Sequence, residues 1–326
     1  MIKIFRQSIA AQLTTILVVA GVMWAGRLVH PVPMPDPTDA APLYKLLYTL
    51  LAPVPRLAAA GALLLHLTTG ALLNNLLYDR KLIHSNMLLP MLLYVLAASL
   101  VPEGQTLTPI LFINLILFWI LHHLIATDTR FKLTSDQVFG VAALLSASTL
   151  FHFPALFMAL PLLIILIFIY KFYNWHDITM LVLGFLAPYL LLFVYSFLTD
   201  GLLTLLTSMG DAIKQWHWTI EATDAVNLCS YVLFGLMLLS SLFFLMGYTG
   251  NKTVIYRNNA TIVVLTLVGG LLMLPYCTHF TTEAQCAAIP FAFIGSLWLI
   301  NSKVKPWIMN MIFTTWVLVS MAGCIL

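Results

Sequence analysis

Residues 178–199 read Ile178-Thr-Met-Leu-Val-Leu-Gly-Phe-Leu-Ala-Pro-Tyr-Leu-Leu-Leu-Phe-Val-Tyr-Ser-Phe-Leu-Thr199, a run of 22 residues without a charged side chain. A helix of that length is about 33 Å long, enough to cross a hydrocarbon core of about 30 Å. Similar runs recur along the chain, which is 61% hydrophobic and only 8% charged, with a mean hydropathy of +0.98. This composition excludes a water-soluble domain and predicts an all-α, polytopic membrane protein.

The charged residues between the apolar runs are segregated by sign. Eleven of the 15 Lys and Arg lie in one set of breaks, and eight of the 12 Asp and Glu lie in the other. The basic set consists of Lys3, Arg6, Arg80, Lys81, Arg130, Lys132, Lys171, Lys252, Arg257, Lys303 and Lys305. The positive-inside rule makes this set cytoplasmic and starts the N-terminus inside. The net charge of +3 then reflects topology and indicates no nucleic-acid partner.

The apolar runs predict about eleven membrane spans within one membrane domain, residues 1–326. The predicted spans are residues 8–29, 56–77, 86–101, 108–126, 136–150, 153–171, 178–199, 225–248, 259–277, 285–301 and 306–325. An odd number of spans places the C-terminus outside. The fifth and sixth are separated only by Phe151-His-Phe-Pro154, which is either a tight hairpin or a break in one helix. A single broken helix would put Lys252 and Lys303 outside, so we favour the hairpin.

Two amphipathic segments are predicted to lie along the outer membrane surface rather than to cross it. Residues 42–52 place five leucines at i, i+3, i+4, i+7 and i+8, and a helix of this length is about 16 Å long. Residues 201–220 carry a similar stripe and end in Trp216-His-Trp218, a composition typical of the interface. These helices either anchor their loops or form the wall of a site at the outer surface.

The first external loop is the strongest candidate for chemistry. It reads Arg27-Leu-Val-His30-Pro-Val-Pro-Met-Pro-Asp36-Pro-Thr-Asp39, and its prolines stiffen it. A carboxylate at the membrane surface can deprotonate an acceptor hydroxyl, or hold a divalent metal that binds a lipid phosphate. The alternative is that Asp36 and Asp39 are turn and cap residues.

Other candidates lie on neighbouring external segments. Glu103 is the only charge in the second external loop. It is either an auxiliary acid or a solvated turn residue. Arg56 and Lys214 are predicted external cations, and like Arg27 and His30 they can bind a donor phosphate. The alternative is that they only extend their charged ends to the membrane surface. His66, Asn74, Asn75 and Asn114 lie within spans, where polar groups are expected to face other helices. No span places an Asp or Glu at mid-membrane, which argues against an ion-coupled transporter.

Four cysteines are scattered along the chain. Cys277 and Cys286 flank the last external loop, so they either form a disulfide or remain two separate thiols at the ends of spans.

The order of these parts resembles that of the type C membrane glycosyltransferases (GT-C). In those enzymes an acidic first external loop is followed by an interfacial helix, a second acid often lies in the second external loop, and a broad external loop follows the seventh span. The matching features here are Asp36 and Asp39, residues 42–52, Glu103 and residues 200–224, so the resemblance covers about residues 1–200 as a GT-C-like core. Residues 201–326 would add the external interfacial segment and the C-terminal spans. The resemblance implies a polyprenyl-phosphate-linked sugar as donor, with a divalent metal ion as a candidate cofactor.

The sequence is also similar to an uncharacterised family of Bacteroidetes inner-membrane proteins. The similar segments are residues 86–95, 99–103 and 188–200, and they imply location in a bacterial inner membrane. The enzymatic interpretation makes Asp39 or Asp36 the base or metal ligand and Glu103 an auxiliary acid. Arg27, His30, Arg56 and Lys214 would bind the donor. The rival interpretations are a non-catalytic membrane subunit or scaffold, and a transporter of lipid or glycan.

Overall fold

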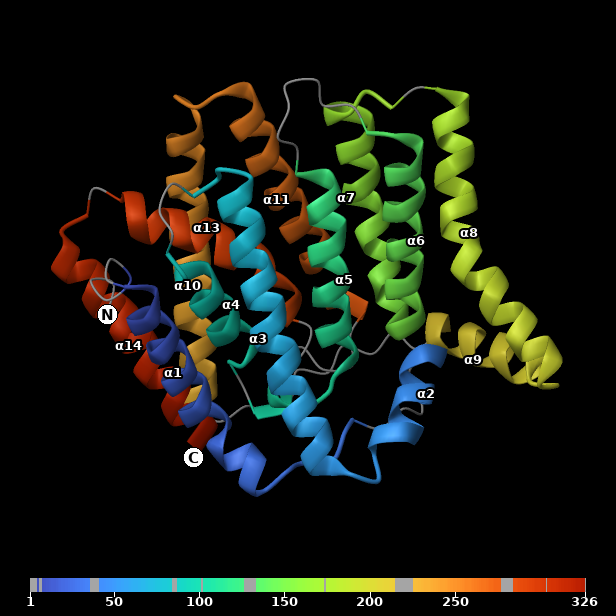
Figure 1. The fold of residues 1–326 in the computed structure, drawn as a ribbon, viewed down its shortest axis with the longest axis horizontal. Coiled ribbons are helices and arrows are strands. Elements are labelled where there is room, and N and C mark those ends of the chain that lie inside the picture. The colour runs from blue at the N-terminus through green and yellow to red at the C-terminus, as the bar shows by residue number, and fades with distance from the viewer. Residues whose placement is uncertain are drawn as a thin grey trace.

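The structure is a computed structural model that describes residues 5, 8–35, 41–83, 87–100, 102–125, 133–172, 174–214, 225–276, 284–302 and 304–325. These residues are helical with no strand among them, as the sequence predicts (Figure 1). The α-helices are α1 (Ile9–Val29), α2 (Pro42–Leu51), α3 (Pro55–Asp79), α4 (Leu89–Ala98), α5 (Pro109–Leu124), α6 (Ser135–Phe151), α7 (Ala159–Ile164), α8 (Trp175–Leu198), α9 (Leu202–Lys214), α10 (Ala225–Thr249), α11 (Val254–Met273), α13 (Ala288–Asn301) and α14 (Pro306–Ile325). Short 3₁₀ segments are η2 (Pro102–Gln105), η3 (Phe153–Met158), η5 (Leu274–Tyr276) and η6 (Ala284–Ala287), and η4 (Ile165–Ile169) is a π-helical segment.

Seven helices of the described chain are long and apolar enough to cross a membrane, so the protein is a multi-pass membrane protein. They are α1, α3, α8, α10, α11, η6 with α13, and α14. Three further apolar helical segments are shorter: α4, α5 and residues 153–169. The ten residues of α4 extend only about 15 Å, half the thickness of the hydrocarbon core. The number of eleven spans therefore stays a prediction.

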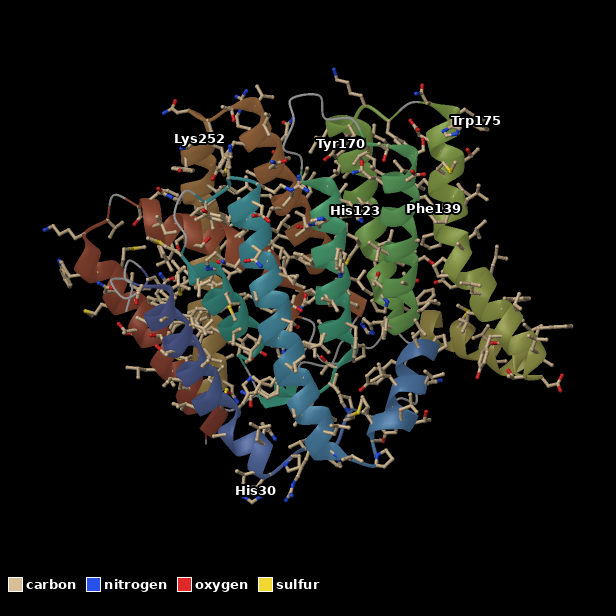
Figure 2. All side chains as sticks on the ribbon, in the orientation of Figure 1. His30, His123, Phe139, Tyr170, Trp175 and Lys252 are labelled. Atoms are coloured by element: carbon tan, nitrogen blue, oxygen red, sulfur yellow. The ribbon has the colours of Figure 1, made fainter. Side chains whose placement is uncertain are left out.

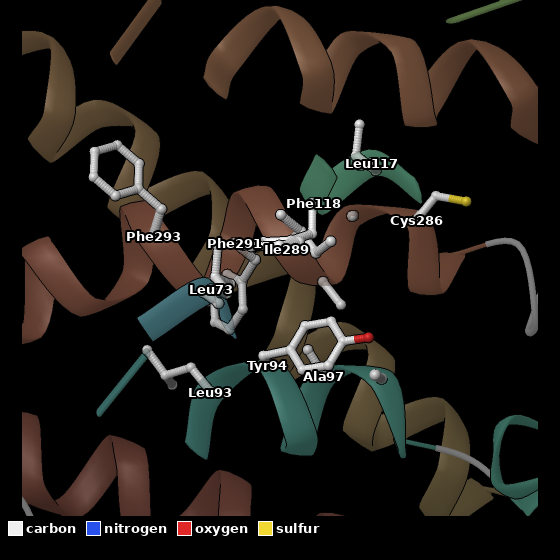
Figure 3. Close-up of a cluster of buried hydrophobic side chains, with 14 of the residues drawn as sticks. Leu73, Leu93, Tyr94, Ala97, Leu117, Phe118, Cys286, Ile289, Phe291 and Phe293 are labelled. Atoms are coloured by element: carbon white, nitrogen blue, oxygen red, sulfur yellow. The ribbon is translucent and has the colours of Figure 1, made fainter. Parts of the chain in front are cut away.

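The centre of the bundle is built on α4 and α13, which pack against each other. Every residue of α4 is buried, and so are twelve of the 14 residues of α13. Figure 3 shows Tyr94 and Leu93 of α4 facing Phe291 of α13, with Leu73 of α3 beside them. A helix that is apolar on every side is stable only where other helices surround it, so this sequence pattern explains why α4 and α13 lie in the centre.

Residues 135–169 form a hairpin, as favoured from the sequence. Figure 2 shows Phe139 near the start of α6 and Tyr170 just after η4 at the same end of the bundle. Phe151 ends α6, and η3 begins two residues later and packs back against it. The chain therefore reverses direction at His152, and a single broken helix is excluded.

The two ends of the bundle carry different loops. In Figure 2, His30 lies at one end, while Tyr170, Trp175 and Lys252 lie at the other. The end with His30 also holds α2 and α9 (Figure 1). The predicted helix over residues 42–52 is confirmed as Pro42–Leu51, and residues 202–214 of the second amphipathic segment form α9. Residues 215–220 of that segment lie outside the described residues.

The outermost element of the described chain is α8, most of whose side chains are exposed. Its main packing partner is α6. Gly184 permits this contact, because a Cβ atom there would lie 2.4 Å from the carbonyl oxygen of Phe139. One turn further on, the hydroxyl groups of Tyr189 and Thr149 lie 2.7 Å apart, within hydrogen-bonding distance. The sequence around residue 184 therefore determines how closely α8 approaches the bundle.

Candidate functional site around Tyr44 and Gly104

The phenol of Tyr44 joins the segment that precedes α2 to the segment between α4 and α5. Its hydroxyl lies 3.0 Å from the carbonyl oxygen of Leu107 and 3.3 Å from that of Pro35, and the side chain is only 1% exposed. Burial raises the pKa of the phenol, with a smaller contribution from Tyr48, so Tyr44 remains a proton donor at neutral pH. Pro35 directly precedes Asp36 in the chain, and Leu107 follows Glu103 by four residues. A side chain of α2 thus brings together the two loops that carry the predicted acids.

The position of α2 follows from its amphipathic sequence. Pro42 occupies the first turn of the helix, where its missing N–H costs no hydrogen bond. Tyr44 faces the protein, whereas Leu46 and Leu50 on the leucine stripe are 50% and 69% exposed. The helix packs against α3 and α6. Leu46 and Leu50 are therefore available to lipid, whereas Leu47 and Leu51 of the same stripe pack against the core.

The segment between α4 and α5, which was predicted to be the second external loop, is packed inside the protein rather than exposed as a turn. Ser99, Leu100 and residues 104–108 are all buried. Glu103 lies on the backbone of η2 in this buried stretch, and its side chain lies outside the described residues. The burial of the residues around Glu103 does not fit a loop that is solvated along its length.

Side chains from distant helices hold this buried loop in place. The indole Nε1 of Trp24, in α1, donates a hydrogen bond to the hydroxyl oxygen of Ser99 at 3.1 Å. The amide Nε2 of Gln105 donates to the carbonyl oxygen of Ser99 at 3.3 Å and to the sulfur of Cys324, in α14, at 2.8 Å. Elements from both ends of the sequence therefore fix the backbone on either side of Glu103.

His66 of α3 contacts the residue that follows Glu103. Its Nε2 lies 3.4 Å from the carbonyl oxygen of Gly104, and the side chain is fully buried. A carbonyl oxygen can only accept, so this contact assigns the proton to Nε2 and leaves Nδ1 as an acceptor. Nδ1 has no hydrogen-bond partner among the described residues. The rings of Trp24 and Tyr94 flank the imidazole, with centroids 5.5 Å and 6.1 Å away.

Gln285 of η6 approaches the same glycine from the other side of the bundle. A Cβ atom on Gly104 would lie 1.9 Å from the amide nitrogen of Gln285, so only glycine fits this backbone position. Asn114 of α5 donates a hydrogen bond to the backbone carbonyl of Gln285 at 3.3 Å. Neither polar atom of the Gln285 side chain has a hydrogen-bond partner within the described chain. A buried amide with unused hydrogen-bonding capacity is costly, and such groups often mark functional positions.

The structure places the predicted site residues as follows. Arg27 lies half-buried in the last turn of α1, with His30 exposed just beyond it, and Arg56 is exposed in the first turn of α3. Lys214 ends α9, whose packing partner is α8, and its side chain lies outside the described residues. Asp36 and Asp39 also lie outside the described residues. The structure therefore brings together the segments next to the acids. The last turn of α1, which carries Arg27, and the first turn of α3, which carries Arg56, lie at the same end of the bundle as His30 (Figures 1 and 2).

The carboxylates predicted to hold a metal, those of Asp36 and Asp39, lie outside the described residues. Within the described ranges, no three His, Cys, Asp or Glu side chains gather in a way that could hold a metal ion. Cys277 lies outside those ranges, and Cys286 is buried against Gly270, so their pairing stays a prediction.

Sequence reasoning identified some of the polar interior and missed the rest. His66, Asn74 and Asn114 are buried between helices as predicted, but Asn75 is exposed. The roles of Trp24, Tyr44, Gln105 and Gln285 were not predicted. The sequence signal for these residues was a polar side chain near the end of an otherwise apolar segment. Only the packed structure shows which of these side chains contact one another. The chain matches no protein-family model, no curated protein and no solved structure.

Proposed function

We propose that this chain is a multi-pass membrane enzyme of the GT-C type, which transfers a sugar from a polyprenyl-phosphate donor at the external leaflet. The observation that carries the proposal is the pair of contacts from Tyr44 to Pro35 and Leu107, which joins the two acid-bearing loops. Two loops joined at one buried phenol can direct their carboxylates to one reaction centre. Such positioning is the main requirement for general acid–base catalysis.

In this enzyme the roles of the residues follow from their chemistry. Asp39 or Asp36 deprotonates the acceptor hydroxyl or holds a divalent metal, and Glu103 is the auxiliary acid. Arg27 and Arg56 bind the donor phosphate because guanidinium groups pair well with phosphate oxygens, and His30 and Lys214 add further N–H donors. The exposed leucines of α2 offer an apolar surface for the polyprenyl chain beside these cations.

The buried polar residues below the loops support the same assignment. His66 and Gln285 hold the backbone at Gly104 between them, next to Glu103. An acid on a rigidly held loop keeps the same geometry from one turnover to the next, which a mobile surface turn does not. The proposed location is a bacterial inner membrane, with the N-terminus cytoplasmic, the C-terminus periplasmic, and the site facing the periplasm.

The test is complementation of a deletion strain, with envelope glycans and lipids as the readout. We expect the double variant of Asp39→Asn with Asp36→Asn, and the single variant that removes the base or metal ligand, to reduce product formation by a factor of roughly 100 or more, while expression is unchanged. Glu103→Gln should also reduce product formation. Asp200→Asn is the matched control, because Asp200 is an exposed external acid whose positive φ of 53° asparagine tolerates.

The outcomes separate the competing functions. If Glu103→Gln and the double Asp variant all restore the wild-type glycans, the catalytic assignment fails and a scaffold role replaces it. If a variant loses product formation only because other envelope proteins disappear from the membrane with it, the chain acts as a subunit of their complex. A transporter would accumulate the unmodified lipid-linked donor on the inner leaflet in the deletion strain, whereas loss of the proposed enzyme leaves the donor in the outer leaflet.

A further inference from the structure

A groove runs between α10 and α11 at the end of the bundle opposite His30. It has a volume of about 920 Å³, part of it open to the surroundings. The residues that line it are Leu242, Leu245, Met246, Thr249, Arg257, Ala260, Thr261 and Val264. The two helices are consecutive in the chain, yet each packs mainly against other elements: α10 against α13 and α14, and α11 against η3, α7 and η6. The groove is the space left where they diverge.

The lining is polar at one end of the groove and apolar along the rest. Thr249 ends α10 and Arg257 stands in the first turn of α11, both beside the connection that carries Lys252. From there the lining continues to Leu242 on α10 and Val264 on α11. Seven residues of helix extend about 10 Å, which is most of the depth of one leaflet of a core about 30 Å thick. The groove therefore has the polarity and the depth of one lipid leaflet.

The polar end of the groove is positively charged. Arg257 is exposed and forms no ion pair with any described residue. The Lys252 ammonium lies 4.5 Å from the ring centre of Tyr248 and 5.8 Å from that of Tyr256, which hold it beside the groove. No acidic residue occurs between Asp224 and Glu283 in the sequence. The whole α10–α11 hairpin therefore presents cations and no anion.

We propose that this groove binds an anionic phospholipid. The phosphate lies at Arg257, close to Lys252, and one acyl chain follows the apolar wall from Met246 to Leu242. An arginine at the membrane surface favours an anionic headgroup over a zwitterionic one, and it can hold two phosphate oxygens at once. A free phosphate ion would use only the cationic end and leave the apolar wall in contact with water, so the amphiphile is the better ligand. This site is independent of the enzymatic proposal and lies at the other end of the bundle.

The test measures lipid retained by the intact, detergent-purified protein, using native mass spectrometry with phosphatidylglycerol and phosphatidylcholine as probes. We expect the wild type to retain phosphatidylglycerol preferentially. Arg257→Gln should reduce this preference roughly fivefold, with a smaller loss of phosphatidylcholine retention, because phosphatidylcholine also has a phosphate but carries no net charge. Thr261→Phe fills the groove from an exposed position and keeps Arg257, so it should reduce retention of both lipids.

The control is Lys305→Gln, which removes an exposed cation of the same predicted membrane side from a different segment. It should retain phosphatidylglycerol as the wild type does. Equal losses in Lys305→Gln and Arg257→Gln would mean diffuse attraction to surface charge and would overturn the site. Unchanged retention in Thr261→Phe would show that the acyl chain is not in the groove and would also overturn it. Circular dichroism and gel filtration establish that each variant is folded.

Discussion

The hydroxyl of Tyr44 lies 3.0 Å from the carbonyl oxygen of Leu107, across 63 residues of sequence and in a fully buried setting. The same hydroxyl lies 3.3 Å from the carbonyl oxygen of Pro35. A phenol has one proton to donate, so the two carbonyl groups share it. This arrangement makes one side chain of the short helix α2 the link between the segment before α2 and the segment between α4 and α5.

Replacing Tyr44 with phenylalanine should loosen both loops without unfolding the protein. The ring keeps its place, but the buried carbonyl of Leu107 loses its donor, which costs about 1–3 kcal/mol. We expect a lower unfolding midpoint, and faster maleimide labelling of a cysteine placed at Val32 in a background without the native cysteines. Tyr48→Phe, in the next turn of α2, is the control and should change neither. Equal labelling rates for wild type and Tyr44→Phe would show that the phenol does not hold the loop.

The contact between Gly104 and Gln285 can be tested by a double-mutant cycle. Gly104→Ala should destabilise the protein, because the new methyl group would lie 1.9 Å from the Gln285 amide nitrogen and 3.0 Å from the carbonyl oxygen of Ala98. Gln285→Ala removes the first of these two obstacles. We expect the double variant to be more stable than the sum of the single effects predicts, by about 0.5–3 kcal/mol. Unfolding midpoints of the four proteins in detergent give the coupling.

Strict additivity in that cycle would contradict the packing of η2 against η6. A suitable comparison is Gly104→Ala combined with Tyr48→Phe, since Tyr48 lies on α2 and should not couple to Gly104. If the enzymatic proposal is correct, Gly104→Ala should also lower activity more than it lowers stability, because it displaces the backbone next to Glu103.

The helical fold could be predicted from the sequence because the lipid environment imposes strong rules. Apolar runs as long as residues 178–199 have few alternatives to a membrane helix, and the sign of the loop charges orders them. The central position of α4 was harder to predict from the sequence. Its ten residues were predicted to be part of a span over 86–101, and only the packing of α13, α3 and α1 around it shows that it is a short buried helix.

The candidate site was predictable only in part. The acids of the first two external loops stand out because so few charges interrupt the chain. Trp24 and Gln285 do not stand out, since a tryptophan or an amide near the end of a span is expected at any membrane interface. Their roles depend on contacts between residues far apart in sequence, such as the Trp24 indole with Ser99, and no local pattern encodes such a contact.

Gly184 should be the residue that allows α8 to pack closely against α6. Gly184→Ala places a methyl group 2.4 Å from the carbonyl oxygen of Phe139, so α8 must move away from α6 at a cost of about 1–3 kcal/mol. Gly235→Ala in α10 is a matched control, because a Cβ atom there meets nothing within 4 Å. That variant should be neutral or more stable by up to about 1 kcal/mol, as expected for alanine in a helix. Similar unfolding midpoints for the two variants would contradict the close approach of α8.

The orientation of the bundle is open to direct measurement by cysteine labelling in intact cells. His30→Cys should react with a membrane-impermeant maleimide, because the positive-inside rule places its end of the bundle outside. Lys252→Cys and Trp175→Cys lie at the opposite end (Figure 2), so they should react only after the membrane is permeabilised. Each cysteine is placed alone after the four native cysteines are replaced.

The two inner positions test different parts of the fold. Lys252 reports on the α10–α11 connection, and Trp175 reports on the segment after the α6–η4 hairpin, since both lie beyond the point where the chain reverses at His152. Labelling of all three positions in intact cells would indicate a damaged membrane, which a cytoplasmic marker protein checks. Labelling of Lys252→Cys and Trp175→Cys together, with His30→Cys protected, would invert the protein in the membrane. That result would move the first two external loops to the cytoplasmic face and remove the basis for a periplasmic site.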